Sequence, residues 1–283
     1  MGSPEVPIID VHTHILPPEL IARAHELEER DEHFRALSRT PNNRYATVEE
    51  LVRDMDGAGV SLSVTFGFAF KDPGLCREVN DYVAASVALY PDRLIGFMCV
   101  QPFDPGLERE ISRCAAAGLR GVGELFPDGQ GFSLKEGPAR LGGLCREAGL
   151  PLLLHVNEQV GHFYPGKGGQ GAADAYAFAA ANPGLRVCFA HWGGGLLFYE
   201  LMPEVRRVLE NVYYDTAAGP FLYDPRVYDV AKASGCIRKV LFGTDYPLLG
   251  PERYIRRMGD GRLGDDDVRM ILSENARRFL DLH

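Results

Sequence analysis

The 283-residue sequence has no apolar run long enough to span a membrane. A spanning helix needs about 18 or more consecutive apolar residues, whereas the run at 150–156 covers only seven positions. The amino terminus also lacks the basic start and apolar segment of a secretory signal, because Ile8–Val11 leads directly into His-Thr-His. We therefore expect a cytoplasmic protein with no membrane partner.

Cysteine pairs and an excess of basic charge are also missing. The six cysteines contain no Cys-x-x-Cys pair, and several lie in apolar runs, which predicts reduced thiols that pack as small hydrophobes. The 30 Lys and Arg residues are outnumbered by 39 Asp and Glu, which leaves a formal net charge of −9. A surface of that sign repels nucleic acid. We therefore expect no nucleic-acid partner.

What remains is the composition of an ordinary globular protein, with 46% hydrophobic and 24% charged residues. The length would allow two domains at roughly 150 residues each. The sequence has no internal repeat, however, and no linker rich in Pro, Gly and Ser. The simpler prediction is one domain over residues 1–283.

Eight short apolar runs alternate with longer amphipathic stretches, a pattern typical of strands and helices around a parallel sheet. The predicted strands are Ile8–His12, Ser61–Phe66, Leu94–Val100, Gly121–Leu125, Pro151–Val156, Arg186–Ala190, Val212–Asp215 and Val240–Gly243. The predicted helices are Val48–Ala58, Leu75–Leu89, Gly106–Ala117, Pro138–Ala148, Gly171–Ala181, Leu196–Glu210, Asp224–Ala233 and Asp265–Leu280. Eight such units predict an α/β fold, a single (β/α)₈ TIM barrel. A doubly wound sheet is the alternative, but no G-x-G-x-x-G turn follows the first strand.

Boundary signals support several of these helices. Thr47 stands before an apolar-periodic run with Glu50 three residues later, which predicts a capping box. Gly59, Gly118 and Gly149 stand where left-handed caps are expected at helix ends.

Two connections are long for a barrel. About 33 residues, Ile15–Thr47, follow the first strand and include a helix-like stretch at Pro18–Glu29, and the Gly-rich segment Asn157–Gly171 follows the fifth. Loops that follow barrel strands line the active face, so both segments are candidate lids.

Histidines and an aspartate gather where the predicted strands end. His12 and His14 are two residues apart on one strand, so their imidazoles point to one face. His155, His191 and Asp245 each end a different strand. If His12 and His14 stood alone, they could be surface histidines in a turn. In a barrel, however, residues at the ends of separate strands meet on one face. Nitrogen and carboxylate donors without a thiolate suit a catalytic site for Zn²⁺ or another first-row divalent metal.

The chain resembles the amidohydrolase superfamily of metal-dependent barrels, and within it the group that includes the aminocarboxymuconate semialdehyde decarboxylase type. The matching segments are Ile9-Asp-Val-His-Thr-His14, Leu154-His-Val156, Phe189-Ala-His-Trp192, Leu241-Phe-Gly-Thr-Asp-Tyr-Pro247 and Ser273-Glu-Asn-Ala-Arg-Arg-Phe-Leu280. The resemblance implies that His12, His14 and His155 bind the metal. It further implies that Asp245 is another ligand that orients or deprotonates a metal-bound water. His191 would bind a second ion or act as an acid/base group.

Glu124 ends the fourth strand, where binuclear relatives use a bridging carboxylated lysine or another bridging ligand. No Lys stands there. Alternation along the strand places Glu124 and Val122 toward the barrel axis and Leu125 toward the helices. We therefore predict Glu124 at the metal pocket, and a pair with Arg120 is the alternative.

Aromatic residues on the loops indicate a flat or apolar small-molecule substrate. Phe66 and Trp192 are the predicted contacts, with core packing as the alternative, and Arg44 is the predicted partner of a substrate carboxylate, with a solvated surface role as the alternative. Asp215, which ends the seventh strand, is interpreted as structural.

The leading functional hypothesis is a hydrolase that attacks a C–N or C–O bond of an amide, lactone or ester with water activated by one or two Zn²⁺ or similar ions. The alternative is a metal-dependent nonoxidative decarboxylase of a small aromatic or dienoic acid, because the same ligand set serves both reactions. A binding protein on an inactive barrel is the third interpretation. Oligomerisation is common in such barrels, so a homodimer stays open.

Overall fold

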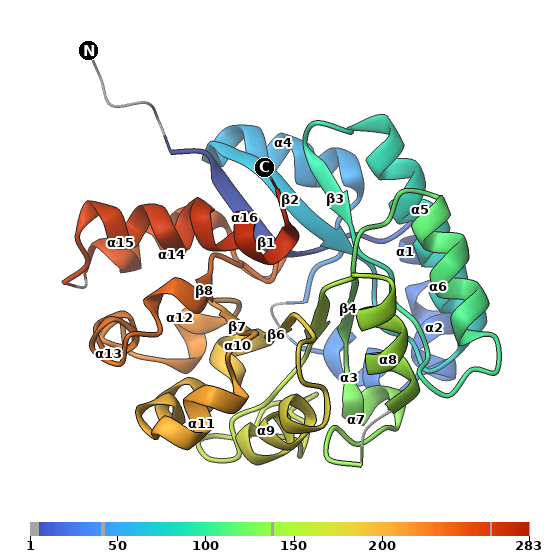
Figure 1. Cartoon of the computed structure of the whole chain (residues 1–283). Coiled ribbons are helices and arrows are strands. Elements are labelled where there is room, and N and C mark those ends of the chain that lie inside the picture. Colours follow the sequence, from blue (N-terminus) through green and yellow to red (C-terminus); the bar gives the residue numbers. More distant parts are fainter. Residues whose placement is uncertain (1–5, 41–42, 137–138, 261, 283) are drawn as a thin grey trace.

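The computed structural model describes residues 6–40, 43–136, 139–260 and 262–282. All eight predicted strands form, and within each of two sheets they pair in parallel in chain order (Figure 1). Their bounds are β1 Ile8–His14, β2 Val60–Phe66, β3 Leu94–Gly96, β4 Val122–Leu125, β5 Leu152–Leu154, β6 Val187–Phe189, β7 Val212–Asp215 and β8 Val240–Leu241. The strands form one sheet of three, β1–β3, and one of five, β4–β8.

Backbone hydrogen bonds join these two sheets along both seams. Between β3 and β4, the N–H of Met98 donates to Gly121 O and the N–H of Gly123 donates to Met98 O, both at 2.9 Å. Where the chain leaves β8, Val11 N–H donates to Phe242 O and Asp245 N–H donates to His12 O, also at 2.9 Å. The strands therefore make a (β/α)₈ barrel, as the alternating pattern predicts.

Helices surround the strands on the outside (Figure 1). The outer helical elements are α4 Val48–Ala58, α5 Pro73–Leu89, α6 Leu107–Ala116, α8 Ala139–Glu147, α9 Ala172–Ala181, α11 Pro203–Val208, α13 Val227–Ala233, α15 Asp265–Arg269 and α16 Asn275–Leu280. The loop after β1 carries α1 Pro18–Ala22, α2 Ala24–Arg30 and α3 Glu32–Ser38. Other helical segments are α7 Pro127–Gln130, α10 Ala190–Gly193, η1 Leu196–Leu201, α12 Gly219–Leu222, η2 Ile237–Lys239, α14 Pro251–Gly259 and η3 Met270–Glu274.

The predicted boundary signals are confirmed. Thr47 and Glu50 form the capping box of α4, with Thr47 N–H donating to Glu50 Oε2 at 2.9 Å. Gly59, Gly118 and Gly149 have φ values of 71°, 95° and 68°, in the left-handed region where glycine carries no steric penalty.

The structure corrects two predicted helices. Leu196–Glu210 is interrupted at Met202, because Pro203 begins a new helix instead of continuing the first. The C-terminal stretch contains the π-helical turn Met270–Glu274 between two α-helices. The predicted first residue of a third helix, Pro138, lies outside the described residues.

Sequence reasoning missed α3 and α14, which are short and charged. The N-cap of α3 is Asp31, whose carboxylate accepts a hydrogen bond from Phe34 N–H at 2.9 Å.

All six cysteines are buried and free, as predicted. Within the described ranges, no helix has both the length and the hydropathy required to cross a bilayer.

Candidate metal centre

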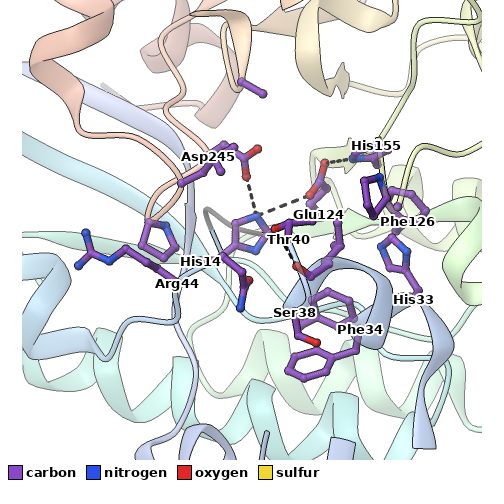
Figure 2. Close-up of a pocket in the computed structure, with 18 of the residues that line it drawn as sticks. His14, His33, Phe34, Ser38, Thr40, Arg44, Glu124, Phe126, His155 and Asp245 are labelled. Atoms are coloured by element: carbon purple, nitrogen blue, oxygen red, sulfur yellow. Dashed lines mark hydrogen bonds and ion pairs between the residues drawn. The ribbon is translucent and has the colours of Figure 1, made fainter. Parts of the chain in front are cut away.

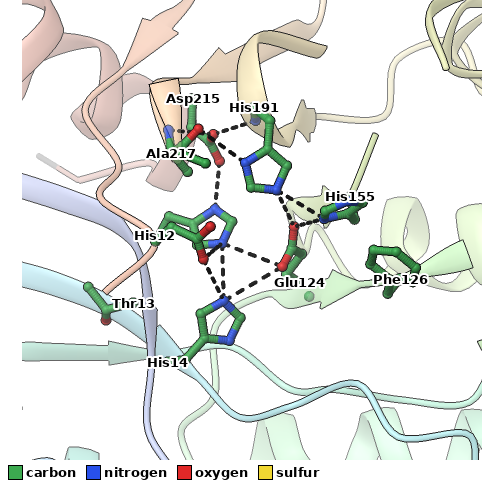
Figure 3. Close-up of polar contacts among 12 residues, drawn as sticks. His12, Thr13, His14, Glu124, Phe126, His155, His191, Asp215 and Ala217 are labelled. Atoms are coloured by element: carbon green, nitrogen blue, oxygen red, sulfur yellow. Dashed lines mark hydrogen bonds and ion pairs between the residues drawn. The ribbon is translucent and has the colours of Figure 1, made fainter. Parts of the chain in front are cut away.

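Six side chains that could hold a metal converge where β1, β4, β5, β6 and β8 end (Figures 2 and 3). They form two triads of potential ligands, in each of which the nearest nitrogen and oxygen atoms lie within 4.8 Å of one another. The first triad is His12, His14 and Asp245, and the second triad is Glu124, His155 and His191. His12, His14, His155 and Asp245, which were expected to bind one metal, are thus brought close together, but His155 belongs to the second triad.

Hydrogen bonds on the far side of the rings fix three imidazole tautomers. His12 Nδ1 lies 2.8 Å from Asp215 Oδ2, His14 Nδ1 lies 3.1 Å from Gly67 O, and His191 Nδ1 lies 3.1 Å from Ala217 O. Carboxylates and carbonyls only accept, so each Nδ1 must carry the proton. Each neutral ring therefore presents the lone pair of Nε2 to the centre.

His155 is held the other way round. Its Nε2 lies 3.2 Å from Asn157 Oδ1, an oxygen that also accepts from the Tyr164 hydroxyl, while its Nδ1 faces Glu124 Oε1 at 3.0 Å. Asn157 is buried. Glu124 Oε1 is also an acceptor, so both nitrogens of His155 face oxygen acceptors. The tautomer with its proton on Nε2, toward Asn157, leaves the lone pair on Nδ1 and completes the second triad.

These donor sets fit a cation. His12 Nε2 and His14 Nε2 lie 3.2 Å apart, and His155 Nδ1 and His191 Nε2 lie 3.0 Å apart. With the tautomers above, both atoms of each pair are acceptors, and a carboxylate stands beside each pair. Two lone pairs repel unless a proton or a metal ion lies between them. Neutral imidazoles with carboxylates are the ligands that Zn²⁺ and similar ions select.

Glu124 stands between the two triads. Its Oε2 lies 3.4 Å from His12 Nε2 and 3.6 Å from His14 Nε2, whereas its Oε1 lies 3.3 Å from His191 Nε2. The side chain thus points into the barrel, as expected, and no described contact joins it to Arg120. Gly123 precedes it with a φ of 125°, and a Cβ there would lie 2.2 Å from Leu153 O, so only glycine fits.

The charges around these groups shift their pKa values strongly. Burial opposes protonation of His12, but Glu124 and Asp215 outweigh it and hold the pKa of His12 well above its ordinary value. In the same way Glu124 overcomes burial and raises the pKa of His191 to about 9. Burial alone would raise the pKa of Asp245, yet the hydrogen bond from His14 and the charge of His12 lower it to about 2. Protons thus occupy positions that a metal would take, so metal binding must displace them.

The backbone is unusual at the same place. Among the described non-glycine residues, five have a left-handed φ, and His191 (58°), Trp192 (59°), Ala218 (53°) and Asp245 (60°) are four of them. His191 and Asp245 supply triad groups, and Ala218 lines the adjoining cavity. Such residues cost free energy and cluster at functional sites. A sequence pattern contains no signal for this feature.

Asp10 supports the centre from one layer below. It occupies the same face of β1 as His12 and accepts hydrogen bonds from Thr244 Oγ1 at 2.6 Å and from Thr244 N–H at 3.1 Å. Burial raises the pKa of Asp10 to about 7. These bonds join β1 to the residue before Asp245 and so align the two strands of the first triad.

A cavity of about 420 Å³ opens onto both triads (Figure 2). The loop after β1 covers it with residues of α3 and the segment that follows α3. Its walls include His33, Phe34, Phe68 and Phe126, and Arg44 stands at its other side in the view of Figure 2. The first long loop therefore forms a cap over the candidate metal centre, as predicted for a lid.

The predicted substrate contacts separate into two groups. Arg44 lines the cavity. Phe66 does not line it and is fully buried, with its ring against His14 at a centroid distance of 4.7 Å. Trp192 is also buried away from the cavity, 5.1 Å from the Tyr228 ring. The structure corrects these two expectations, because the rings support the site from the core and do not face a substrate.

Sequence reasoning missed Asn157, which orients His155, and interpreted Asp215 as structural although it orients His12. It also missed His33 and Phe126 in the cavity wall. Asp215 could have been noticed because it ends a strand, as the triad residues do. His33 lies on a helix that the pattern did not predict, so no signal was available.

The fold and the site define a class of protein: a (β/α)₈ barrel with nitrogen and carboxylate donors for a divalent metal at the carboxyl ends of its strands. A family model described as amidohydrolase matches residues 9–282, and the chain belongs to this family.

The chain is similar to 2-amino-3-carboxymuconate-6-semialdehyde decarboxylase of Dictyostelium discoideum, with 25% identity over 97% of this chain and 91% of that protein. Among solved structures it is similar to 5-carboxyvanillate decarboxylase from Sphingomonas paucimobilis, with a TM-score of 0.81, 16% identity and coverage of 99% and 100% of the two chains. It also resembles the manganese complex of 5-carboxyvanillate decarboxylase from Novosphingobium aromaticivorans, with a TM-score of 0.78, 18% identity and coverage of 98% and 96%. These structural likenesses extend over nearly the whole barrel.

Proposed function

We propose that this protein is a metal-dependent nonoxidative decarboxylase of a small aromatic or dienoic carboxylic acid. The observation that carries the proposal is the cavity: aromatic rings form its wall, the metal donors its floor, and Arg44 offers a cation beside them. Decarboxylase is also the activity in the printed names of the relatives above. This reaction replaces hydrolysis as the leading hypothesis.

The first triad would hold a divalent ion, with Zn²⁺ or another first-row metal as the proposed species. When bound, such an ion polarises substrate oxygens and lowers the pKa of a bound water. The chain itself positions the donors. Asp215 and Gly67 O fix the rings of His12 and His14, and the left-handed backbone at Asp245 places its carboxylate beside them.

Decarboxylation breaks the C–C bond, releases CO₂ and leaves the electron pair on a substrate carbon, which must take up one proton. His191 is the proposed donor. Its backbone N–H donates to Asp215 Oδ1 at 2.8 Å and its Nδ1 is held by Ala217 O, so Nε2 faces the centre. His191 also lines the cavity. A positioned acid/base group of this kind contributes typically 10²–10⁴ in rate.

Arg44 is the proposed partner of a second anionic or carbonyl group on the substrate. It lines the cavity, is exposed, and has no described carboxylate within ion-pair distance. A guanidinium binds a planar carboxylate through two parallel hydrogen bonds. Arg44 would therefore align a flat acid along the aromatic wall.

Hydrolysis of an amide, lactone or ester is the second candidate, and one observation favours it. The two oxygens of Glu124 face different triads, as those of a carboxylate that bridges two ions would. A binuclear centre is suited to activate water between its ions.

The test uses protein purified without chelator, with its metal content measured before assay. Hydroxybenzoates, unsaturated dicarboxylates, lactones and amides are incubated in D₂O. We expect CO₂ release and one deuterium on the carbon that lost it, and no turnover after chelation. Hydrolysis of a lactone or amide, with two ions per chain and loss of one in Glu124→Gln, would reject the decarboxylase in favour of the second candidate.

A further inference from the structure

His33 is a titratable residue of the cavity wall that the proposed reaction does not use. It lies on α3 in the cap, and its ring stacks on Phe126 with a centroid distance of 3.7 Å and an interplanar angle of 21°. Phe126 in turn packs against His155 at 4.1 Å. His33 is thus one ring away from the second triad, on the cavity side shown in Figure 2.

The edge of the His33 ring carries its polar atoms, and its faces are covered. Phe68 stacks on it at 5.5 Å and 28°, in addition to Phe126. The Cδ2 edge is filled, because a Cβ added at Gly129 would lie 2.7 Å from that atom. Cε1, the atom between the two nitrogens, lies 3.7 Å from the corresponding Cβ position at Gly166, which lines the same cavity. Gly166 therefore stands beside the nitrogen-bearing edge of the ring, and the Leu37 side chain already occupies the place that a Cβ at Gly166 would take.

Neither ring nitrogen has a hydrogen-bond partner among residues 6–40, 43–136, 139–260 and 262–282, yet neither is sealed from solvent. Burial lowers the pKa of His33 to about 4, with a smaller contribution from the charge of His155. The ring is therefore neutral near pH 7 and offers one donor and one acceptor. Both nitrogens are therefore available to a polar group of a ligand that replaces water in the cavity.

We propose that His33 is a specificity-determining residue that hydrogen-bonds a hydroxyl group on the ring of an aromatic carboxylate bound in the cavity. This inference rests on the proposed function for the carboxylate. Phe34, Phe68 and Phe126 hold the ring of the ligand, and His33 supplies a polar contact that distinguishes a phenolic acid from an unsubstituted one. A hydroxyl group can both donate and accept, so either His33 tautomer accommodates it.

The test is calorimetric binding of benzoate and of 2-, 3- and 4-hydroxybenzoate to the protein as purified. A net hydrogen bond is worth about 1 kcal/mol, so the wild type should bind at least one hydroxybenzoate about 5-fold or more tightly than benzoate. His33→Phe keeps the stacking and removes the nitrogens. In this variant the preference should fall below about 2-fold, with benzoate affinity nearly unchanged.

Two further variants separate hydrogen bonding from packing. His33→Gln should keep part of the preference, because the amide restores a donor and an acceptor. If a phenylalanine does not fit in place of His33, the smaller side chain of His33→Leu removes the nitrogens instead, and this variant must lose the preference for hydroxybenzoate. His25→Phe is the matched control, since His25 is exposed on the neighbouring α2 and should keep the full preference.

No preference in the wild type, or a preference that survives in His33→Phe or His33→Leu, would overturn the role of His33. CO₂ release from the same acids is measured in parallel. Absence of CO₂ would overturn the proposed decarboxylation, whereas the calorimetric ratios decide the role of His33 independently of turnover.

Discussion

The two triads of the candidate centre use the same kinds of ligand but are supported differently. The first triad lies on the adjacent strand ends of β8 and β1, and its histidines are fixed by groups in the barrel itself, Asp215 and Gly67 O. The second triad lies on β4, β5 and β6, and His155 depends on Asn157.

The support of His155 extends into the second long loop. Asn157 donates its backbone N–H to Gln170 O at 3.0 Å and accepts from Tyr164, and both of these residues belong to the Gly-rich segment after β5. Tyr164 also lines the cavity. The first triad is therefore built into the barrel, whereas the geometry of the second is tied to a loop that contacts whatever fills the cavity.

The largest effect is expected from removing one ligand of the first triad, which tests whether this triad holds the metal needed for turnover. We expect His14→Ala to lose its bound metal and to reduce kcat by about 1,000-fold or more, since metal polarisation supplies several kcal/mol. Metal content by elemental analysis and turnover measure both effects. His25→Ala, on the exposed face of α2, is the control and should change neither. Retained metal in His14→Ala would show that the second triad holds the essential ion.

The matching change in the second triad should affect the reaction without removing the first ion. We expect His191→Asn to lower kcat by about 100-fold or more while the metal of the first triad stays bound, because His191 is placed as an acid/base group. The measurement is kcat together with metal content after dialysis. Unchanged turnover would make His191 structural, and loss of all metal would mean that the two triads act as one.

Asp215 is the support on which the first triad depends most. We expect Asp215→Asn to weaken metal affinity by about 10- to 100-fold, the range typical of groups that orient metal-bound histidines. An amide can donate to His12 Nδ1 as well as accept, so the tautomer is no longer fixed. Competition with a chelator measures the affinity. The control is Asp224→Asn on the exposed face before α13, which should leave the affinity unchanged.

The role of Asp215 shows where sequence reasoning reaches its limit. The barrel follows from local patterns: apolar runs alternate with amphipathic ones, and the predicted strand Val212–Asp215 has the observed bounds. The His12–His14 pair follows from the two-residue repeat of a strand. The contact between His12 and Asp215 joins positions 203 residues apart, and no local pattern encodes it.

The failures at Phe66 and Trp192 have related causes. Phe66 continues β2 to its last residue, and alternation alone does not say which side of a barrel strand meets a cavity. Trp192 follows His191 in a left-handed backbone, which redirects its ring into the core. His33 was missed because α3 is only seven residues long and owes its position to packing against Phe126 and Phe68.

The smallest expected effect concerns stability and distinguishes the metal-free from the metal-loaded state. Glu124 raises the pKa of His191 to about 9 from an ordinary value near 6.5. Between these pH values the folded metal-free protein binds more protons than the unfolded chain, so its free energy of unfolding must fall as pH rises. Below pH 6.5 this contribution is fully present, and above pH 9 it is lost.

We therefore expect the Tm of chelator-treated protein to decrease from pH 6.5 to pH 9 more steeply than the Tm of metal-loaded protein, in which a cation takes the place of the proton. Calorimetric scans at matched ionic strength measure the difference. Glu124→Gln should flatten the slope of the metal-free protein, because the hydrogen-bonded carboxylate that raises the pKa of His191 is gone. Glu147→Gln, exposed on α8, should keep it. Equal slopes in Glu124→Gln and in wild type would mean that the Glu124 carboxylate does not raise the pKa of His191. The second triad would then not differ from the first in this electrostatic interaction.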